Sequence, residues 1–393
     1  MVNAVDANRA WIAGAIATLD EDRRREIDTP LLKLDLPELP ACQVHIKDET
    51  AHPTGSLKHR LARSLFLHAI CNGDIREGTT VVEASSGSTA ISEAYFANLL
   101  KLPFIAVLPR GTATAKRDAI ARAGAQIHLV DPADGISAVA ARVARERHGH
   151  FMDQFTFAER ATDWRGNNNI AESLFAQMAQ EIHPVPAWVV VGAGTGGTSA
   201  TIGRFIRYRP ELNGCRLCVV DPEQSAFFAY FANGDRNVRG GCGGVIEGIG
   251  RACVEASFMR NVVDRMMLVP NAASIAGARW LETRLGRRFG PSTGTNIIGT
   301  LALAARMHAQ GSRGSIATLA CDAGDRYEDT IYDDDWLAAR QIDPAAWQDR
   351  LARLTDDHSF GFDLEVSDGE ERHDPPGAST AAGLHTRAPG GAG

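Results

Sequence analysis

Lys58 is the first residue along the chain whose type and position indicate covalent chemistry. It follows a short loop, residues 53–57, and leucines recur after it at helical spacing. We therefore expect it in the first turn of an amphipathic helix, with Thr54 or Ser56 as the N-cap. The positive end of the helix dipole disfavours an ammonium ion and favours the neutral, nucleophilic amine. Such an amine can form a Schiff base with an aldehyde.

A glycine-rich loop, Gly192-Ala-Gly-Thr-Gly-Gly-Thr198, is a candidate phosphate site. It follows the apolar run AWVVV and opens the helical pattern TSATIGRFI. Backbone N–H groups at a helix start bind phosphate, and Thr195 and Thr198 add hydroxyl donors. The same glycines fit G-x-G-x-x-G and the next strand ends in Asp221, so a dinucleotide site stays open, as does a simple tight turn.

The run Ser85-Ser-Gly-Ser-Thr89 is the third candidate loop, between the apolar segment TTVVEA and the helical pattern AISEAYFANLL. Hydroxyl and N–H groups at a helix start suit a small carboxylate, although an ordinary Ser/Thr cap has the same composition. A reactive lysine, a phosphate cup and a carboxylate site in one chain together predict pyridoxal phosphate holding an amino acid.

The elements that position these loops alternate along the chain. Short runs rich in Val, Ile and Leu are separated by amphipathic segments, which is typical of buried parallel sheets covered by helices. The predicted strands are residues 79–83, 104–108, 126–130, 188–191, 216–220, 266–269 and 316–320. The predicted helices are residues 90–100, 112–124, 137–147, 170–182, 198–208, 272–285 and 295–308. So many strands favour an α/β protein with two doubly wound lobes, whose ligands bind at the carboxyl ends of the strands.

These motifs resemble those of the fold-type II pyridoxal-phosphate enzymes, the cysteine synthase and cystathionine β-synthase family, from about residue 28 to about residue 336. PTGSLKHR resembles P-x-G-S-V-K-D-R, SSGST resembles T-S-G-N-T, and GTGGT is identical to the family's phosphate cup. The family's other motifs resemble DTPLLKL at 28–34, the Gln154-Phe155 pair, IEGIG at 246–250 and the G-x-S-x-G stretch around Ser292. The longer segments SSGSTA, QFTFAERATDW and ACDAGDRY are most similar to those of bacterial L-cysteine desulfhydrases. The resemblance implies the tryptophan synthase β-subunit-like fold.

The resemblance also implies a role for each matching residue. Lys58 would be the catalytic lysine that binds the cofactor, and Ser292 would meet the pyridine nitrogen. The other cofactor contacts would be Ser88, Gly194, Thr195, Gly196, Gly197 and Thr198. The substrate would be held by Ser85, Ser86, Gly87, Thr89 and Gln154. We expect no metal ion in this site.

Two residues favour elimination of a β-substituent. Ser292 is neutral and need not stabilise a fully protonated ring, which favours prompt loss of the leaving group. Ser88 replaces the family's asparagine and shortens the loop, which favours product release. We therefore expect β-elimination of L-cysteine to hydrogen sulfide, pyruvate and ammonia. The alternatives are a cysteine synthase making L-cysteine by β-replacement, an NAD-dependent oxidoreductase, and a non-catalytic binding protein of the same fold.

The net charge of −7 comes almost entirely from one end of the 393-residue chain. Residues 355–393 hold eight acids and two bases, a balance of −6, so the remainder is nearly neutral. That balance argues against a nucleic-acid partner. We find no signal peptide and no long apolar run, which predicts a cytoplasmic protein without membrane contact. Its partner would be a small-molecule substrate, and the family's habit implies a homodimer.

Four regions are expected along the chain. Residues 1–49 would pack on the larger lobe, and residues 50–160 would form a smaller, mobile lobe with Lys58 and the substrate loop. Residues 161–354 would form the larger, phosphate-binding lobe. Residues 355–393 are too rich in Asp, Glu, Gly and Pro to form a core, so we expect a disordered acidic C-terminal tail.

The cysteines and histidines outside these motifs offer weaker signals. Seven cysteines spread along the chain favour reduced thiols over a disulfide framework. Cys215 and Cys218 should point to opposite faces of a strand. No role for Cys242 or Cys253 follows from the sequence. The histidines at 52, 59, 148 and 150 form no complete set of metal ligands.

Overall fold

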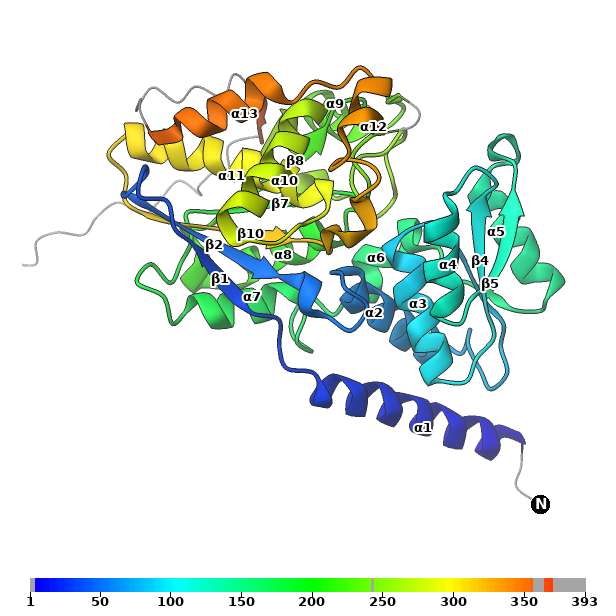
Figure 1. The fold of residues 1–393 in the computed structure, drawn as a ribbon. Helices are drawn as coiled ribbons and strands as arrows, with labels where there is room; N and C mark the ends of the chain where they lie inside the picture. The colour runs from blue at the N-terminus through cyan, green and yellow to red at the C-terminus, as the bar shows by residue number, and fades with distance from the viewer. Residues whose placement is uncertain (1–3, 242–243, 356–363, 370–393) are drawn as a thin grey trace, which may run out of the picture.

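Two sheets, each covered by helices, form the two lobes of the protein (Figure 1). The computed structural model describes residues 4–241, 244–355 and 364–369. Within that part of the chain, no helix is long and apolar enough to cross a membrane.

The larger lobe contains a seven-stranded sheet in the order β1-β2-β10-β7-β8-β9-β11. Strands β2, β10, β7, β8 and β9 run parallel to one another, whereas β1 and β11 pair antiparallel at the two edges. The central strands are buried on both faces, which explains why their sequences are continuous apolar runs. The bounds are β1 (Leu31–Leu34), β2 (Cys42–Asp48), β7 (Trp188–Gly192), β8 (Arg216–Pro222), β9 (Arg265–Val269), β10 (Gly314–Ala320) and β11 (Glu365–Asp368).

Helices cover both faces of this sheet. Helices α10 (Asn271–Leu285), α11 (Pro291–Ala309) and α13 (Ala345–Ala352) share one hydrophobic core with it. Helices α7 (Ile170–Met178), α8 (Gly197–Tyr208) and α9 (Ala226–Asn233) share the core on the opposite face. A short helix, α12 (Asp334–Ala339), packs at the side.

The smaller lobe contains a four-stranded parallel sheet in the order β5-β4-β3-β6. Its strands are β3 (Val81–Ala84), β4 (Phe104–Pro109), β5 (Gln126–Val130) and β6 (His150–Phe151). Helix α5 (Ile136–Glu146) covers one face. The other face is covered by α2 (Lys58–Asn72), α3 (Ser88–Leu99), α4 (Thr114–Arg122) and α6 (Gln154–Ala161).

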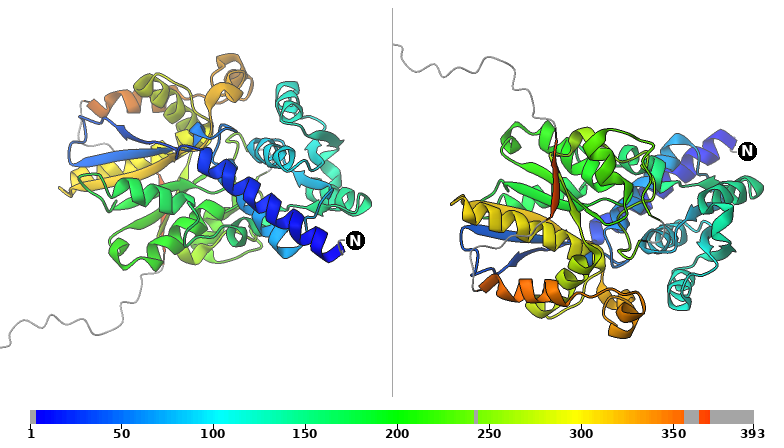
Figure 2. Two further views of the ribbon diagram at one scale, coloured as in Figure 1. Left: turned by 90° about the horizontal axis from the view of Figure 1, so that it is seen from below. Right: turned by 90° about the horizontal axis from the view of Figure 1, so that it is seen from above.

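The predicted α/β fold with two parallel-sheet lobes is confirmed, and all seven predicted strands are present. Two regional predictions need correction. Strands β1 and β2 lie in the larger sheet, but α1 (Ala4–Arg25) packs against α2 of the smaller lobe, because Ala15 and Leu19 join the core of that lobe (Figure 2). The first 49 residues therefore do not all pack on the larger lobe.

The prediction of a wholly disordered tail is wrong for residues 364–369. Strand β11 pairs with the edge strand β9, and Asp368 accepts a 2.5 Å hydrogen bond from the guanidinium of Arg265. An edge strand offers unpaired N–H and C=O groups, and the acidic segment satisfies them. The other tail residues beyond Thr355 lie outside the described residues.

Candidate functional site

A cavity of about 800 Å³ lies where the two lobes meet, at the carboxyl ends of their parallel strands. The predicted site residues that line it are Lys58, Ser85, Ser86, Gly87, Ser88, Thr89, Gln154, Gly194, Thr195, Gly196, Thr198 and Ser292. Gly197 lies beside a small adjoining cavity, which Lys58, Thr195 and Thr198 also line. Residues from five separate stretches of the sequence therefore meet in one place.

Lys58 is held at the start of α2 by contacts on both sides. The backbone N–H of Lys58 donates to Ser56 Oγ (3.3 Å), and the N–H of Leu57 donates to the carbonyl of Cys321 at the end of β10 (2.8 Å). Burial lowers the pKa of Lys58, while Cys321 and Asp322 act in the opposite direction. The structure thus favours a neutral amine by burial in addition to the helix dipole.

The phosphate cup depends on the absence of side chains. A Cβ on Gly194 would lie 2.2 Å from the carbonyl oxygen of Gly248, and one on Gly196 would lie 2.5 Å from the Cα of Phe258. Gly196 also has a φ of +91°, which favours glycine. Helix α8 begins at Gly197, whose N–H donates to Thr195 Oγ1 (3.1 Å). The cup therefore presents backbone close to an anion at a helix N-terminus.

The substrate loop is joined to Gln154, and together they form one wall of the cavity. Thr89 Oγ1 donates a 2.8 Å hydrogen bond to Gln154 Oε1, and both residues are buried. Ser85 Oγ accepts from the N–H of Gly87 (3.3 Å), which shapes the turn before α3. The amide NH₂ of Gln154 and the N–H groups at the start of α3 are the donors that this wall can offer to a carboxylate.

Ser88 lies in the cavity wall, where its hydroxyl contacts the larger lobe. Arg326 Nη1 donates to Ser88 Oγ (2.7 Å), and Ser88 in turn donates to Asp322 Oδ2 (3.3 Å), which also accepts from the hydroxyl of Tyr327 (2.7 Å). Arg326 Nη2 donates to the carbonyl of Thr54 (2.7 Å). Sequence reasoning did not assign Asp322 or Arg326 to the site, although both lie in the ACDAGDRY segment that resembled the desulfhydrases.

The floor of the cavity at Ser292 is uncharged. Ser292 lies in the first turn of α11 and is buried. It shares a hydrogen bond with Cys321, whose pKa is raised to about 12 by burial, so that side chain remains a neutral thiol. Asn296 Nδ2 supports the same thiol at 3.4 Å. A heterocyclic nitrogen placed against Ser292 and Cys321 would meet neutral groups there.

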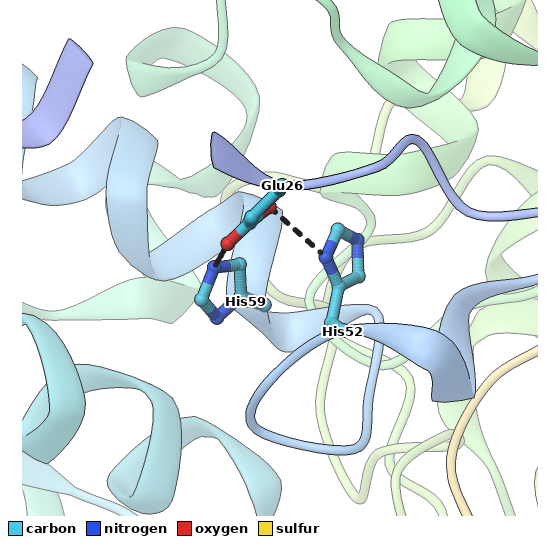
Figure 3. A group of neighbouring side chains, drawn as sticks. All are labelled: Glu26, His52 and His59. Carbon is cyan, nitrogen blue, oxygen red and sulfur yellow. Dashed lines mark hydrogen bonds and ion pairs between the residues drawn. The ribbon is translucent and has the colours of Figure 1, made fainter. Parts of the chain in front are cut away.

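Behind Lys58, Glu26 joins two histidines (Figure 3). Its carboxylate accepts from His59 Nε2 (2.6 Å) and lies 3.5 Å from His52 Nδ1. The other nitrogen of His52 faces Glu49 (3.1 Å), and that of His59 faces Thr54 (3.2 Å). Two ligand atoms of one tetrahedral zinc ion lie about 3.3 Å apart. The 2.6 Å between His59 Nε2 and Glu26 Oε1 is shorter than that and is the distance of a hydrogen bond. The cluster ties the end of α1 to the loop and helix that carry Lys58.

The features proposed for other functions have structural roles. Asp221 is buried and accepts a 2.8 Å hydrogen bond from the N–H of Phe228 in the first turn of α9, whose N-cap is Ser225, and it does not line the cavity. Cys215 and Cys218 lie in the cores on opposite faces of the larger sheet, as predicted. Cys253 lies 3.7 Å from Glu255, and Cys242 is outside the described residues.

Residues 23–322 match the model of the pyridoxal-phosphate-dependent enzymes. This chain belongs to that family. The residues of the site fit the cofactor, because the cup can take a phosphate only where Gly194 and Gly196 lack side chains, and a buried lysine of lowered pKa faces the same cavity.

Among the relatives, the L-cysteine desulfhydrase Cds1 of Mycobacterium tuberculosis is 58% identical over 342 residues, covering 86% of this chain and 92% of that protein. Cysteine synthase 1 of Neurospora crassa is 25% identical, over 80% of this chain and 84% of its own length. The crystal structure of an O-ureido-L-serine synthase matches with a TM-score of 0.68 and 24% identity, over 82% of this chain and 98% of that one. This structural match confirms the fold-type II architecture.

Proposed function

We propose that this pyridoxal-phosphate-dependent enzyme is an L-cysteine desulfhydrase. It would convert L-cysteine and water into hydrogen sulfide, pyruvate and ammonia. The observation that carries the proposal is the 58% identity with the M. tuberculosis desulfhydrase over nearly its whole length. The buried lysine, the glycine cup and the uncharged floor at Ser292 support it.

Lys58 would act as the general base. Its amine lies in the cavity and burial favours the neutral form, so it can take the proton from the substrate's Cα. The bound cofactor supplies an electron sink for the charge left at that carbon. The cup at Gly194–Thr198 would hold the phosphate, and Ser292 would offer its hydroxyl to the pyridine nitrogen without adding a charge.

The wall formed by the substrate loop and Gln154 would orient the amino acid. Its carboxylate would accept from the N–H and hydroxyl groups of residues 85–89 and from the amide of Gln154, whose position Thr89 fixes. This orientation would leave the Cα proton facing Lys58.

Ser88 supports elimination over β-replacement. Its hydroxyl is engaged by Arg326 and Asp322 at the wall, so it does not extend over the cavity as a longer amide would. The loop then holds the eliminated product less firmly, so this product is released before a second substrate can add to it.

The test is product analysis of the purified holoenzyme. With L-cysteine we expect sulfide and pyruvate in equal amounts, and Lys58→Ala should reduce the rate by about 10³-fold or more, the usual contribution of a general base. Formation of cysteine from O-acetylserine and sulfide, with no pyruvate from L-cysteine, would instead establish the cysteine synthase alternative.

We also propose the setting in which the enzyme works. It would act on a free amino acid in the cytoplasm, since buried thiols such as Cys218 and Cys321 suit a reducing compartment.

The family resemblance also implies how the enzyme is assembled. Residues 50–160 would be a mobile lobe that closes on residues 161–354, and the enzyme would be a homodimer. Light scattering should then give twice the chain mass of 42.2 kDa.

A further inference from the structure

Two carboxyl side chains, Glu83 and Glu93, lie together in the interior of the smaller lobe. Both are fully buried, and a hydrogen bond joins them. Glu83 belongs to β3 and Glu93 to α3, the two elements that flank the substrate loop. Neither residue lines the cavity. Two buried carboxylates in contact cannot both be ionised, so the pair holds at least one proton.

The hydrogen bonds of the pair show which carboxyl carries that proton. Glu83 Oε1 accepts from the N–H of Ala84 (2.6 Å), and Oε2 accepts from the N–H of Gln154 (3.2 Å). With both carboxylates ionised, neither oxygen of Glu93 would have a partner among the described residues. A proton on Glu93 provides that partner, because its O–H can donate to Glu83. Glu83 is then a carboxylate that accepts three hydrogen bonds.

Among the described residues, the groups that most affect the pKa values of Glu83 and Glu93 include no positive charge. Burial raises the pKa of Glu83 to about 7, against the effect of the N–H groups of Ala84 and Gln154, and Asp153 raises it further. Burial and Glu83 together raise the pKa of Glu93 well above the usual value. The charged groups that act on Glu83 are thus Glu93 of α3 and Asp153, the N-cap of α6, and both are acids.

The two N–H groups held by Glu83 belong to the two segments of the substrate wall. Ala84 immediately precedes the loop 85–89, and the side chain of Gln154 is bound by Thr89 of that loop. Glu83 therefore fixes the backbone of both segments from behind, while Thr89 fixes their side chains on the cavity side.

We propose that Glu83 and Glu93 are positioning residues that share a proton and hold the loop 85–89 and Gln154 in place for the carboxylate of the amino-acid substrate. This inference rests on the proposed function, because it concerns the same substrate wall. An ionised Glu83 accepts hydrogen bonds more strongly than a protonated one. Substrate binding should therefore tighten as Glu83 loses its proton.

The first test measures binding of L-serine to the holoenzyme by the change in cofactor absorbance between about pH 5.5 and pH 7.5, below the titration of an α-amino group at about 7.7 or higher. The wild-type Kd should fall about fivefold with rising pH, the effect of strengthening hydrogen bonds to a charged acceptor. Glu83→Gln should show a weak Kd that does not change with pH. Glu93→Gln keeps a donor and should preserve the pH dependence, whereas Glu93→Leu should move its midpoint to higher pH.

A matched control separates positioning from loss of stability. Val143 is buried in the core on the other face of the same sheet, so Val143→Ala should lower the melting temperature and leave the pH dependence of Kd unchanged. The shared proton is tested on the apoprotein by infrared spectroscopy at about pH 8. The carbonyl band of a buried carboxylic acid should be present in the wild type and lost in Glu93→Gln.

The outcomes distinguish this inference from the proposed function. If the holoenzyme binds L-serine with the expected pH dependence but releases no sulfide from L-cysteine, the desulfhydrase proposal fails and the inference stands. If Glu83→Gln keeps the wild-type pH dependence, or the infrared band is absent from the wild type, the inference is wrong whatever the reaction. A holoenzyme that binds no amino acid would overturn both.

Discussion

Arg326 Nη1 donates a 2.7 Å hydrogen bond to Ser88 Oγ, and this contact joins the larger lobe to the substrate loop of the smaller one. The same guanidinium donates to the carbonyl of Thr54, in the loop that leads to Lys58. One side chain therefore fixes, from across the cavity, two segments of the smaller lobe that the reaction needs. A second contact between the lobes, a 2.5 Å ion pair of Lys116 with Glu247, lies at the same cavity.

We predict that Arg326→Ala weakens substrate binding more than it slows the chemical step. Loss of the two hydrogen bonds leaves Ser88 with only its longer bond to Asp322 and frees the Thr54 carbonyl, so KM for L-cysteine should rise about tenfold with a smaller change in kcat. Arg326→Lys should recover only part of the loss, because an ammonium lacks the planar fork that reaches both acceptors. Steady-state kinetics checks both variants, and an unchanged KM in Arg326→Ala would contradict the role.

The glycine cup gives a prediction about cofactor affinity. Gly196→Ala places a Cβ against the backbone of Phe258 at a positive φ, so the cup must deform and the affinity for pyridoxal phosphate should fall at least 100-fold. Gly214→Ala is the matched control, since nothing lies within 4 Å of its Cβ and its φ is not positive. Titration of the two apoproteins with pyridoxal phosphate, followed by absorbance, measures the difference. Equal affinities would show that the cup does not bind the phosphate.

The cluster of Glu26, His52 and His59 should make the stability of the protein depend on pH. Burial raises the pKa of Glu26, but hydrogen bonds from His52 and His59 outweigh it and lower this pKa to about 2. A carboxyl whose pKa is depressed in the folded state stabilises the protein above its unfolded pKa of about 4.5, and that contribution is lost as pH falls towards 2. Allowing for its partial exposure to solvent, we expect about 2 kcal/mol at pH 7.

Urea unfolding of Glu26→Gln checks this value. The free energy of unfolding should drop by about 2 kcal/mol at pH 7, and the difference from wild type should shrink near pH 3. Glu21→Gln removes an exposed ion pair with Arg25 on α1 and should cost less than about 1 kcal/mol. A loss of equal size at both pH values would show that charge on Glu26 is not the cause.

Much of the fold could be predicted because the buried parallel strands have a strong local signal. The runs at Trp188 and Ile316 are apolar throughout since both faces of the sheet are covered. Strands β1, β6 and β11 were missed because they lie at sheet edges, where one side is exposed and the sequence need not be apolar. Strand β2 lies inside the larger sheet and was missed because its sequence, CQVHIKD, places polar and charged residues such as His45 and Lys47 in buried positions. Strand β11 is also acidic, and its pairing depends on Arg265, about a hundred residues away in the sequence.

The candidate site was predictable where chemistry requires a local motif, as at Lys58 and the cup. The contacts of Asp322, Arg326, Glu83 and Glu93 were not, because each acts through a partner that only the tertiary fold brings near. Ser88 illustrates the difference. Its substitution for asparagine was visible in the sequence, whereas its bond to Arg326 required the structure.

The last prediction concerns the balance between elimination and β-replacement. Ser88→Asn restores the asparagine of the T-S-G-N-T motif and extends a longer side chain over the cavity. The eliminated product should therefore be retained longer. With O-acetylserine and sulfide, the ratio of cysteine formed to pyruvate released should rise about tenfold. Ser88→Ala is the control, because it also breaks the contact with Arg326 but adds no amide, and its ratio should stay near that of the wild type. If the two variants give the same ratio, the reach of residue 88 does not decide the fate of the product.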